Sequence, residues 1–207
     1  MGRFGSYWGA VSKVLFALCS LLFPLSAVAQ GDDAALLQQL AATMRACDPY
    51  EVSFVMEGEG FALQGRYVVA GDRYRITLPE AEVWGEAAMR YEVDHRRETI
   101  TLTPIDQQRG NLLDNPTRAF DFAAADYRAE VVEERDGVVR LKLTTESDPL
   151  TTIYLTLDGS TARPRAVRYE IDGIGVDLRL KTLKKSSDPL PQFALSNYAE
   201  YEVVDFR

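Results

Sequence analysis

The chain has very few of the side chains on which most enzymes rely. Its 207 residues include one histidine, His95, and two cysteines, Cys19 and Cys47. It lacks the CxxC and HExxH patterns of metal sites, the GxSxG pattern of serine hydrolases and a glycine-rich phosphate loop. We therefore predict no catalytic residue, no bound metal ion and no cofactor.

The two residues that could still carry chemistry have simpler interpretations. His95 lies in the polar segment Asp94–Arg97, and a single histidine in such a turn is typically solvated. Cys47 falls at the expected end of a helix, where a free cysteine usually acts as a small apolar side chain. Catalysis or metal binding by His95, and a reactive thiol at Cys47, remain the alternatives.

Positive charge is also scarce. There are 23 lysine and arginine residues against 31 aspartate and glutamate residues, which gives a net charge of −8. A chain this acidic repels the phosphates of nucleic acid and of anionic membrane surfaces. We therefore expect no nucleic-acid partner, and we expect a monomer.

One long apolar run lies near the start. Arg3 and Lys13 precede the apolar segment Val14–Phe23, and Ala27–Ala29 supplies the small residues of a cleavage site before Gln30. This pattern predicts a secretory signal peptide over residues 1–29 and a single mature domain over residues 30–207. Beyond residue 29 no stretch approaches the roughly 20 apolar residues of a membrane-spanning helix.

Loss of the signal peptide would change both the charge and the redox chemistry. Removing the two positive charges of Arg3 and Lys13 takes the net charge from −8 to −10. Cys47 would then be the only cysteine, so no disulfide can form within the chain. We expect the core alone to stabilise the exported domain.

The mature sequence begins with one amphipathic helix. Apolar side chains recur at spacings of three and four at Leu36, Leu37, Leu40 and Met44. Asp32 and Asp33 place negative charge at the start of this helix, as the helix dipole favours, and it should end near Cys47–Pro49.

After Pro49 the apolar period changes to two. Short alternating segments are separated by turn signals such as Asp136–Gly137 and Asp172–Gly173. These segments cover residues 52–56, 61–69, 74–78, 89–93, 99–103, 127–134, 138–144, 153–157, 167–171, 174–181 and 201–206. Residues 105–126 interrupt the pattern, and Asn115–Pro116 could start a short helix. The chain should therefore form a mainly β (α+β) fold, a curved antiparallel sheet of about eleven strands.

Aromatic residues are concentrated on the apolar register of these strands. They include Phe54, Phe61, Tyr67, Tyr74 and Tyr91, whereas Trp84 has the opposite register from Val83. Such a set is typical either of ordinary core packing or of the wall of a lipid cavity. The alternation alone leaves open a tightly closed barrel core and a partly open hydrophobic hollow.

Several segments together resemble a known family. Gly65–Pro79 is similar to the LolA-like outer-membrane lipoprotein carriers, in the form found in Bacteroidetes-like bacteria. Further similar segments follow in the same order at Glu82–Trp84, Met89–Asp94, Glu98–Ile100, Asn115–Pro116, Phe193 and Val203–Arg207. The chain departs from the family pattern at Glu86–Ala87, at Tyr91 and at Ala70, where other members have an Asp-Gly turn, a tryptophan and a latching arginine.

The resemblance implies a fold and a function. The fold is an incomplete β-barrel closed by the N-terminal helix and a short central helical segment, which would act as lids. The function is that of a periplasmic, non-enzymatic carrier in a Gram-negative bacterium. It would take acylated lipoproteins, or another lipid, from an inner-membrane lipoprotein-releasing transporter to the outer membrane.

The expected ligand site is a cavity lined by one face of the early strands. The candidate lining residues are Val52, Phe54, Leu63, Tyr67, Val69, Tyr74, Ile76, Met89, Tyr91 and Val93. The main alternative is a ligand-free envelope interaction or stress-sensing module with a filled core on the same fold, because a fold does not determine its cargo.

Overall fold

The computed structural model describes residues 32–86, 88–105, 116–118, 120–122, 127–187 and 189–207. The predicted signal peptide and most of residues 105–126 lie outside the described residues. The helices are α2 (Asp32–Cys47), η1 (Pro116–Arg118) and η3 (Leu195–Tyr198). The strands are β1 (Tyr50–Gly58), β2 (Phe61–Ala70), β3 (Arg73–Thr77), β4 (Ala81–Glu86), β5 (Met89–Asp94), β6 (Thr99–Pro104), β7 (Arg128–Arg135), β8 (Val138–Thr144), β9 (Thr151–Asp158), β10 (Pro164–Ile171), β11 (Ile174–Lys185) and β12 (Glu202–Asp205).

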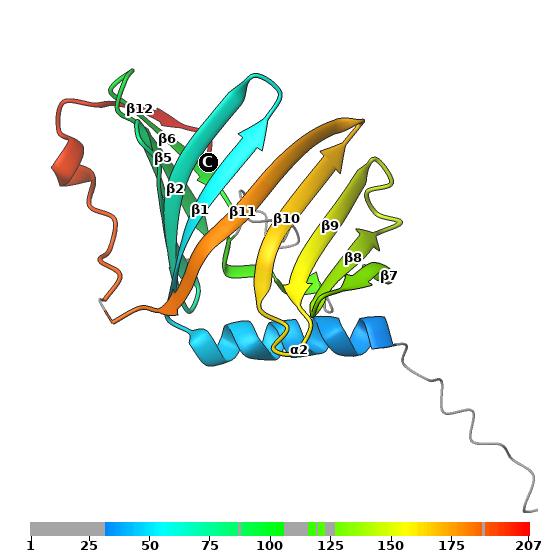
Figure 1. The fold of residues 1–207 in the computed structure, drawn as a ribbon. Helices are drawn as coiled ribbons and strands as arrows, with labels where there is room; N and C mark the ends of the chain where they lie inside the picture. The colour runs from blue at the N-terminus through cyan, green and yellow to red at the C-terminus, as the bar shows by residue number, and fades with distance from the viewer. Residues whose placement is uncertain (1–31, 87, 106–115, 119, 123–126, 188) are drawn as a thin grey trace, which may run out of the picture. The chain divides into compact units, whose positions relative to one another are not determined.

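In the described part of the chain, twelve strands form one sheet. Their order is β12-β6-β5-β4-β3-β2-β1-β11-β10-β9-β8-β7. The sheet is curved, and its edge strands β12 and β7 are not paired with each other (Figure 1). The predicted incomplete barrel is therefore confirmed, with one strand more than expected. The last strand departs from the antiparallel prediction, because β12 runs parallel to β6.

The hairpin turns follow from their sequence. Asp136 and Gly137, between β7 and β8, have φ angles of 52° and 73°. Asp172 and Gly173, between β10 and β11, have φ angles of 50° and 81°. Two successive positive φ angles characterise the turns that match the right-handed twist of paired strands, and Asp-Gly is a favoured pair for them. Both turns lie where the sequence predicts them.

The helix α2 crosses one end of the strands (Figure 1). It begins at Asp32 and ends at Cys47, two residues before Pro49, as its pattern predicts. Its apolar side buries Leu40 and Met44 against the sheet. Of the predicted central helix, the described residues include the single turn of η1, and Phe120 and Phe122 after it are buried in the same core. None of the described helices is long and apolar enough to cross a membrane.

The described side chains form two apolar clusters, one on each side of the sheet. The inner face, which α2 covers, carries the larger cluster, with contributions from β1 to β4 and from β7 to β11. The outer face carries a smaller cluster on β4, β5 and β6. Residues 189–201, which include η3, cover this second cluster, and we call them the C-terminal strap.

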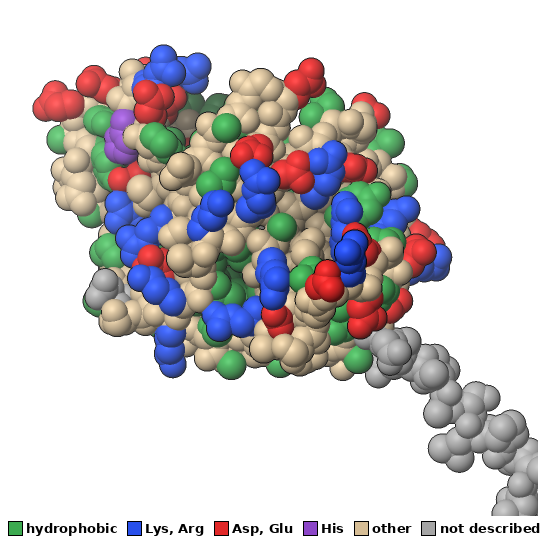
Figure 2. Space-filling view, in the orientation of Figure 1, with side chains coloured by type: hydrophobic (Ala, Val, Ile, Leu, Met, Phe, Trp, Pro, Cys, Tyr) green, Lys and Arg blue, Asp and Glu red, His purple; other side chains and the backbone are tan. Residues whose placement is uncertain are grey.

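Elsewhere on the outer face, charged side chains predominate. Arg179 pairs with Glu57, and Arg168 pairs with Asp177, across neighbouring strands. Figure 2 shows basic and acidic side chains interspersed over these strands. Exposed ion pairs of this kind contribute at most about 1 kcal/mol each, so this face keeps the sheet hydrated and the apolar clusters provide most of the stability.

Candidate functional site

The inner face contains an apolar pocket of about 90 Å³. It lies among β1 to β5 and β11, because alternate residues of these strands point to the same side of the sheet. Its lining consists of Phe54, Met56, Tyr67, Ile76, Leu78, Val83, Arg90 and Leu178. Only Tyr67 and Arg90 bring polar atoms to it. An apolar wall with a few polar groups is the usual composition of a small-molecule site.

Seven of the ten predicted lining residues lie together on the inner face. Strand pairing places Val52, Tyr67 and Ile76 in one row across β1, β2 and β3. The next row towards α2 pairs Val69 with Tyr74. The seven are Val52, Phe54, Leu63, Tyr67, Val69, Tyr74 and Ile76, all buried except Leu63, which packs at the edge of the cluster. Three of them, Phe54, Tyr67 and Ile76, line the pocket itself.

The other three predicted residues lie on the opposite face. Tyr91 pairs with Trp84, and both belong to the outer cluster. Met89 and Val93 flank Tyr91 at alternate positions of β5 and therefore point to the same side. Met89, Tyr91 and Val93 thus cannot line the surface formed by the other seven. The prediction that all ten share one face is wrong. The alternation shows which residues of a strand point the same way, but it does not show towards which face of the sheet they point.

Five pocket residues were not among the predicted set. They are Met56, Leu78, Val83, Arg90 and Leu178. Met56, Leu78 and Leu178 continue the apolar registers of β1, β3 and β11, so the alternation could have identified them. Arg90 carried no such signal, because it reaches the pocket from a strand whose apolar residues face outward.

A second hollow, of about 380 Å³, lies at the helix end of the inner face. Its lining is mixed: apolar side chains such as Met44 of α2, Tyr50 of β1 and Phe120 after η1 lie beside the polar side chains of Arg45, Asp48, Thr117 and Asp121. The ring of Tyr50 packs edge-on against that of Tyr67, with 6.2 Å between centroids. Tyr67 in turn lines the first pocket. This tyrosine pair therefore separates the two hollows.

The Tyr67 side chain is electrostatically unusual. Only 1% of the residue is exposed, and its hydroxyl has no hydrogen-bond partner among the described residues. Burial, with smaller effects of Tyr50 and Tyr169, raises the pKa of Tyr67 well above its ordinary value. The hydroxyl therefore stays protonated, and it can donate a hydrogen bond.

Arg90 is the charged group of the pocket. Its Nε lies 2.7 Å from Oε1 of Glu92, and only 17% of the Arg90 side chain is exposed. Arg90 and Glu92 occupy alternate positions of β5 and so share the inner face. The inner side of β5 is therefore polar at the boundary of the apolar wall.

The outer cluster is built from stacked aromatic rings. Phe193 of the C-terminal strap stacks on Tyr91 at 4.2 Å and on Tyr198 at 5.6 Å between centroids. The centroid of the Trp84 ring lies 5.9 Å from that of Phe193, with the two rings tilted by 60°. The guanidinium of Arg75 lies over the Trp84 ring at 4.3 Å. These contacts fix the strap to β4 and β5.

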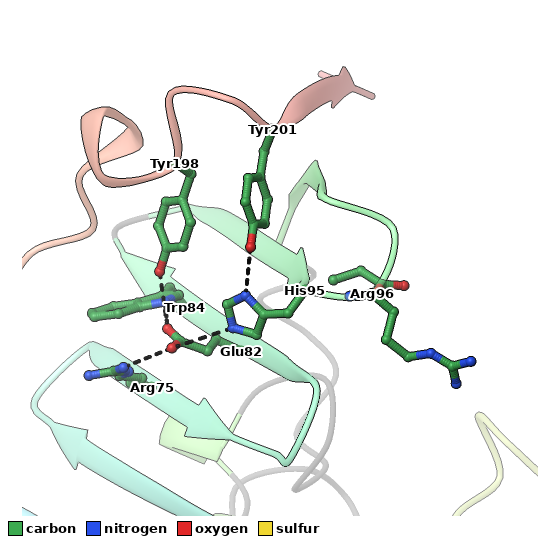
Figure 3. Close-up of polar contacts among 8 residues, drawn as sticks. Arg75, Glu82, Trp84, His95, Arg96, Tyr198 and Tyr201 are labelled. Atoms are coloured by element: carbon green, nitrogen blue, oxygen red, sulfur yellow. Dashed lines mark hydrogen bonds and ion pairs between the residues drawn. The ribbon is translucent and has the colours of Figure 1, made fainter.

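Glu82 joins this cluster to the strap by hydrogen bonds (Figure 3). Its carboxylate accepts them from Arg75 at 3.0 Å, Trp84 Nε1 at 2.9 Å and the Tyr198 hydroxyl at 3.1 Å. Burial alone would raise the pKa of Glu82, but these donors and the charge of Arg75 outweigh it, so the pKa lies below its ordinary value. Burial and the neighbouring Glu82 raise the pKa of Tyr198.

His95 belongs to the same network. Its Nδ1 lies 3.0 Å from the Tyr201 hydroxyl, and its Nε2 lies 3.7 Å from Oε1 of Glu82 (Figure 3). The turn does leave His95 partly solvated, with 34% of its side chain exposed, but Tyr198 and Tyr201 of the strap also pack against its ring, so it is not a free surface residue. Among the described side chains, no group of three or more histidine, cysteine, aspartate or glutamate residues is arranged to hold a metal ion.

Comparison with known proteins identifies the fold. No protein-family model matches the sequence, and no curated protein matches it. An uncharacterized conserved protein from Thermus thermophilus is similar in structure, with a TM-score of 0.54 and 11% identity, over 83% of this chain and 97% of that chain. MucB of Pseudomonas aeruginosa, in its complex with MucA, has a TM-score of 0.51 and 20% identity over 84% of this chain. The match covers 64% of that chain.

A LolA superfamily protein is also among the structural neighbours. It comes from Nitrosomonas europaea and has a TM-score of 0.42 and 12% identity, over 76% of this chain and 95% of that chain. None of these comparisons bears on the Bacteroidetes form of the family. At identities this low the likeness concerns the fold alone. This chain shares that fold with the Thermus thermophilus protein and with MucB, and in this chain it is an incomplete β-barrel with one long helix.

Proposed function

We propose that this protein is a non-enzymatic periplasmic carrier that buries the acyl chains of lipoproteins or other lipids against the inner face of its sheet. The observation that carries this proposal is the apolar pocket, whose lining has six hydrocarbon or thioether side chains and only two polar ones. Each buried methylene contributes about 0.8 kcal/mol, so an acyl chain gains affinity in proportion to the length that enters.

The size of the pocket determines how uptake would work. Ligand pockets usually measure roughly 300–1,000 Å³, and the pocket is about 90 Å³. We expect a longer acyl chain to displace the tyrosine pair, which would join the pocket to the 380 Å³ hollow beneath α2. Moving these rings costs packing energy, so binding should be moderate, as a carrier that must release its cargo requires.

The proposed route follows from the family resemblance. Cargo would come from an inner-membrane lipoprotein-releasing transporter and pass to the outer membrane, with the protein crossing the periplasm as a monomer. The helix α2 and the segment around η1 would serve as lids, because both lie over the second hollow. The net negative charge suits this role, since it keeps the carrier from adsorbing to anionic lipid surfaces.

A charge placed at the pocket tests the proposal. Leu78 lies at the pocket and is only partly buried, so a Leu78→Asp variant should fold and should lose at least 10-fold in affinity for a fluorescent fatty-acyl probe. Thr77→Asp is the matched control, because Thr77, the last residue of β3, is the exposed neighbour of Leu78. Equal binding by both variants and the wild type would contradict the proposal.

Native mass spectrometry of the protein from periplasmic extracts would then identify the cargo. A bound mass matching a triacylated peptide supports lipoprotein transport, and a free lipid mass supports a carrier of another lipid. A bare mass together with no uptake of the acyl probe would contradict both.

A second function is favoured by a specific observation. A structure that is similar over 84% of this chain is that of MucB in complex with another protein, MucA. In addition, the apolar pocket of this chain measures only about 90 Å³. A protein-binding module on this fold would use its surface and leave the interior filled. It predicts no acyl uptake in the wild type, and a protein partner whose binding Leu78→Asp leaves unchanged.

A further inference from the structure

The buried hydroxyl of Tyr67 has no structural explanation within the described part of the chain. Natural cores leave few buried polar atoms without a hydrogen bond, and each such atom costs stability. The Tyr67 ring packs between Tyr50 and Phe54, with centroids 6.2 and 6.0 Å away. A phenylalanine would make the same ring contacts without an unpaired hydroxyl.

The position of Tyr67 suggests what the hydroxyl could recognise. Tyr67 lines the pocket, and it also forms half of the pair that separates the pocket from the hollow beneath α2. A ligand that extends past the pocket would therefore meet this hydroxyl inside an otherwise apolar interior. A protonated phenol there can donate a hydrogen bond to an oxygen, and a hydrogen bond in such surroundings discriminates strongly against ligands that lack the oxygen.

We propose that the Tyr67 hydroxyl donates a hydrogen bond to the carbonyl oxygen of a bound acyl group. The ligand would then be an acyl ester or a fatty acid, and a plain hydrocarbon of the same length would bind less well. This inference rests on the proposed carrier function and adds a specificity-determining residue to it. Esters and free acids share the carbonyl, so the test must separate these two sources.

Arg90 offers the competing explanation. Its guanidinium is the other polar group of the pocket, and it would favour a carboxylate over an uncharged ester. If Arg90 determined the ligand preference, palmitic acid would bind more tightly than a hydrocarbon, and methyl palmitate would bind like a hydrocarbon. If Tyr67 determines it, both carbonyl compounds bind more tightly than the hydrocarbon.

Competition binding tests this directly. The delipidated protein is loaded with N-phenyl-1-naphthylamine, and the probe is displaced by palmitic acid, methyl palmitate or hexadecane. In the wild type both carbonyl compounds should displace it at roughly 3- to 10-fold lower concentration than hexadecane, the range expected of one hydrogen bond. Tyr67→Phe should abolish this preference and leave hexadecane displacement unchanged. Tyr74→Phe is the control, because Tyr74 is a buried tyrosine of the same face that does not line the pocket.

Each outcome has a defined meaning. A preference that survives in Tyr67→Phe, or one shown by palmitic acid alone, overturns the role of Tyr67 and leaves the carrier function standing. Equal displacement by all three compounds in the wild type overturns it as well. If the wild type takes up neither the probe nor any of the three compounds, the carrier function itself fails. Melting curves of both variants confirm that each is folded before binding is measured.

Discussion

Glu82 is the residue on which most polar contacts of the outer cluster converge. It lies on β4, beside the strand that carries Arg75, and it reaches Tyr198 of the C-terminal strap, 116 positions further along the chain. Only 14% of its side chain is exposed. A carboxylate this covered is stabilising only while it remains ionised and hydrogen-bonded. The attachment of the strap should therefore depend on pH.

Protonation of Glu82 should weaken the fold in acid. The pKa of Glu82 is lower in the folded protein than its ordinary value of 4.5, so the unfolded chain binds more protons in the interval between the two. The stabilisation is complete above pH 4.5 and is lost as the pH falls through the folded pKa. In denaturant unfolding between pH 7 and pH 3, Glu82→Gln should be less stable than the wild type at pH 7, and the difference should shrink in acid. Glu80→Gln, at an exposed carboxylate, is the control, and a constant difference between wild type and Glu82→Gln would contradict this account.

Two glycines test packing at the residue scale. A Cβ at Gly85 would lie 2.0 Å from the buried ring of Tyr74, which cannot retreat. Gly85→Ala should therefore lower the free energy of unfolding by about 1–3 kcal/mol. A Cβ at Gly175 would lie 2.4 Å from the end of the flexible Arg168 side chain, so Gly175→Ala should change it by less than about 0.5 kcal/mol. Urea denaturation measures both, and equal losses would show that Tyr74 is not fixed as described.

At the scale of elements, β4 is the strand at which the buried apolar side chains change from the inner to the outer face of the sheet. Val83 faces the inner cluster and Trp84 faces the outer one, so both faces of this strand are buried. On β5 only the outward side is apolar, and its inner side carries Arg90 and Glu92. The C-terminal strap makes this change possible, because it covers apolar residues that would otherwise be exposed.

This change explains what the sequence could and could not predict. The alternation correctly predicts the strands, the hairpin turns and the shared face of Phe54, Tyr67 and Ile76, because these depend on local spacing. It could not predict the side of Tyr91, since that depends on contact with Phe193, about 100 residues away. The opposite registers of Val83 and Trp84 were the one local sign that a second apolar surface exists.

Removal of Phe193 should release the strap. Phe193 stacks on Tyr91 and Trp84, so Phe193→Ala should cost roughly 2–3 kcal/mol, somewhat less than a fully buried phenylalanine. The chain has two tryptophans, Trp8 and Trp84, and Trp8 lies in the predicted signal peptide. In the mature protein Trp84 emission should therefore shift to longer wavelength in this variant. Leu195→Ala, at a 46% exposed strap residue, should leave the emission unchanged, and a shift in both variants would mean that the strap loosens as a whole.

At the scale of the whole molecule, one sheet serves two separate purposes. The inner face of β1 to β5, with β11, provides the pocket, whereas the outer face of β4 to β6 provides the attachment of the strap. The two surfaces lie on opposite sides of β4 and β5, and β6 contributes only to the outer one. A ligand in the pocket should therefore stabilise one part of the sheet and leave the other nearly unaffected, because stability is local where contacts are separate.

Amide hydrogen exchange with and without palmitic acid tests this division and the face of each strand together. Acyl binding should slow exchange in peptides covering β1, β2, β3 and β11, because the strands that form the pocket wall open less often when it is filled. Peptides covering Thr99–Pro104 should exchange at unchanged rates, since Ile100 and Leu102 of β6 pack in the outer cluster beneath the strap and no residue of β6 lines the pocket. The Leu78→Asp variant, which should bind at least 10-fold more weakly, provides the control for effects of palmitic acid on its own. Equal protection of β6 and β1 in the wild type would mean that the outer cluster does reach the ligand, and the assignment of the two clusters to opposite sides of the sheet would have to be abandoned.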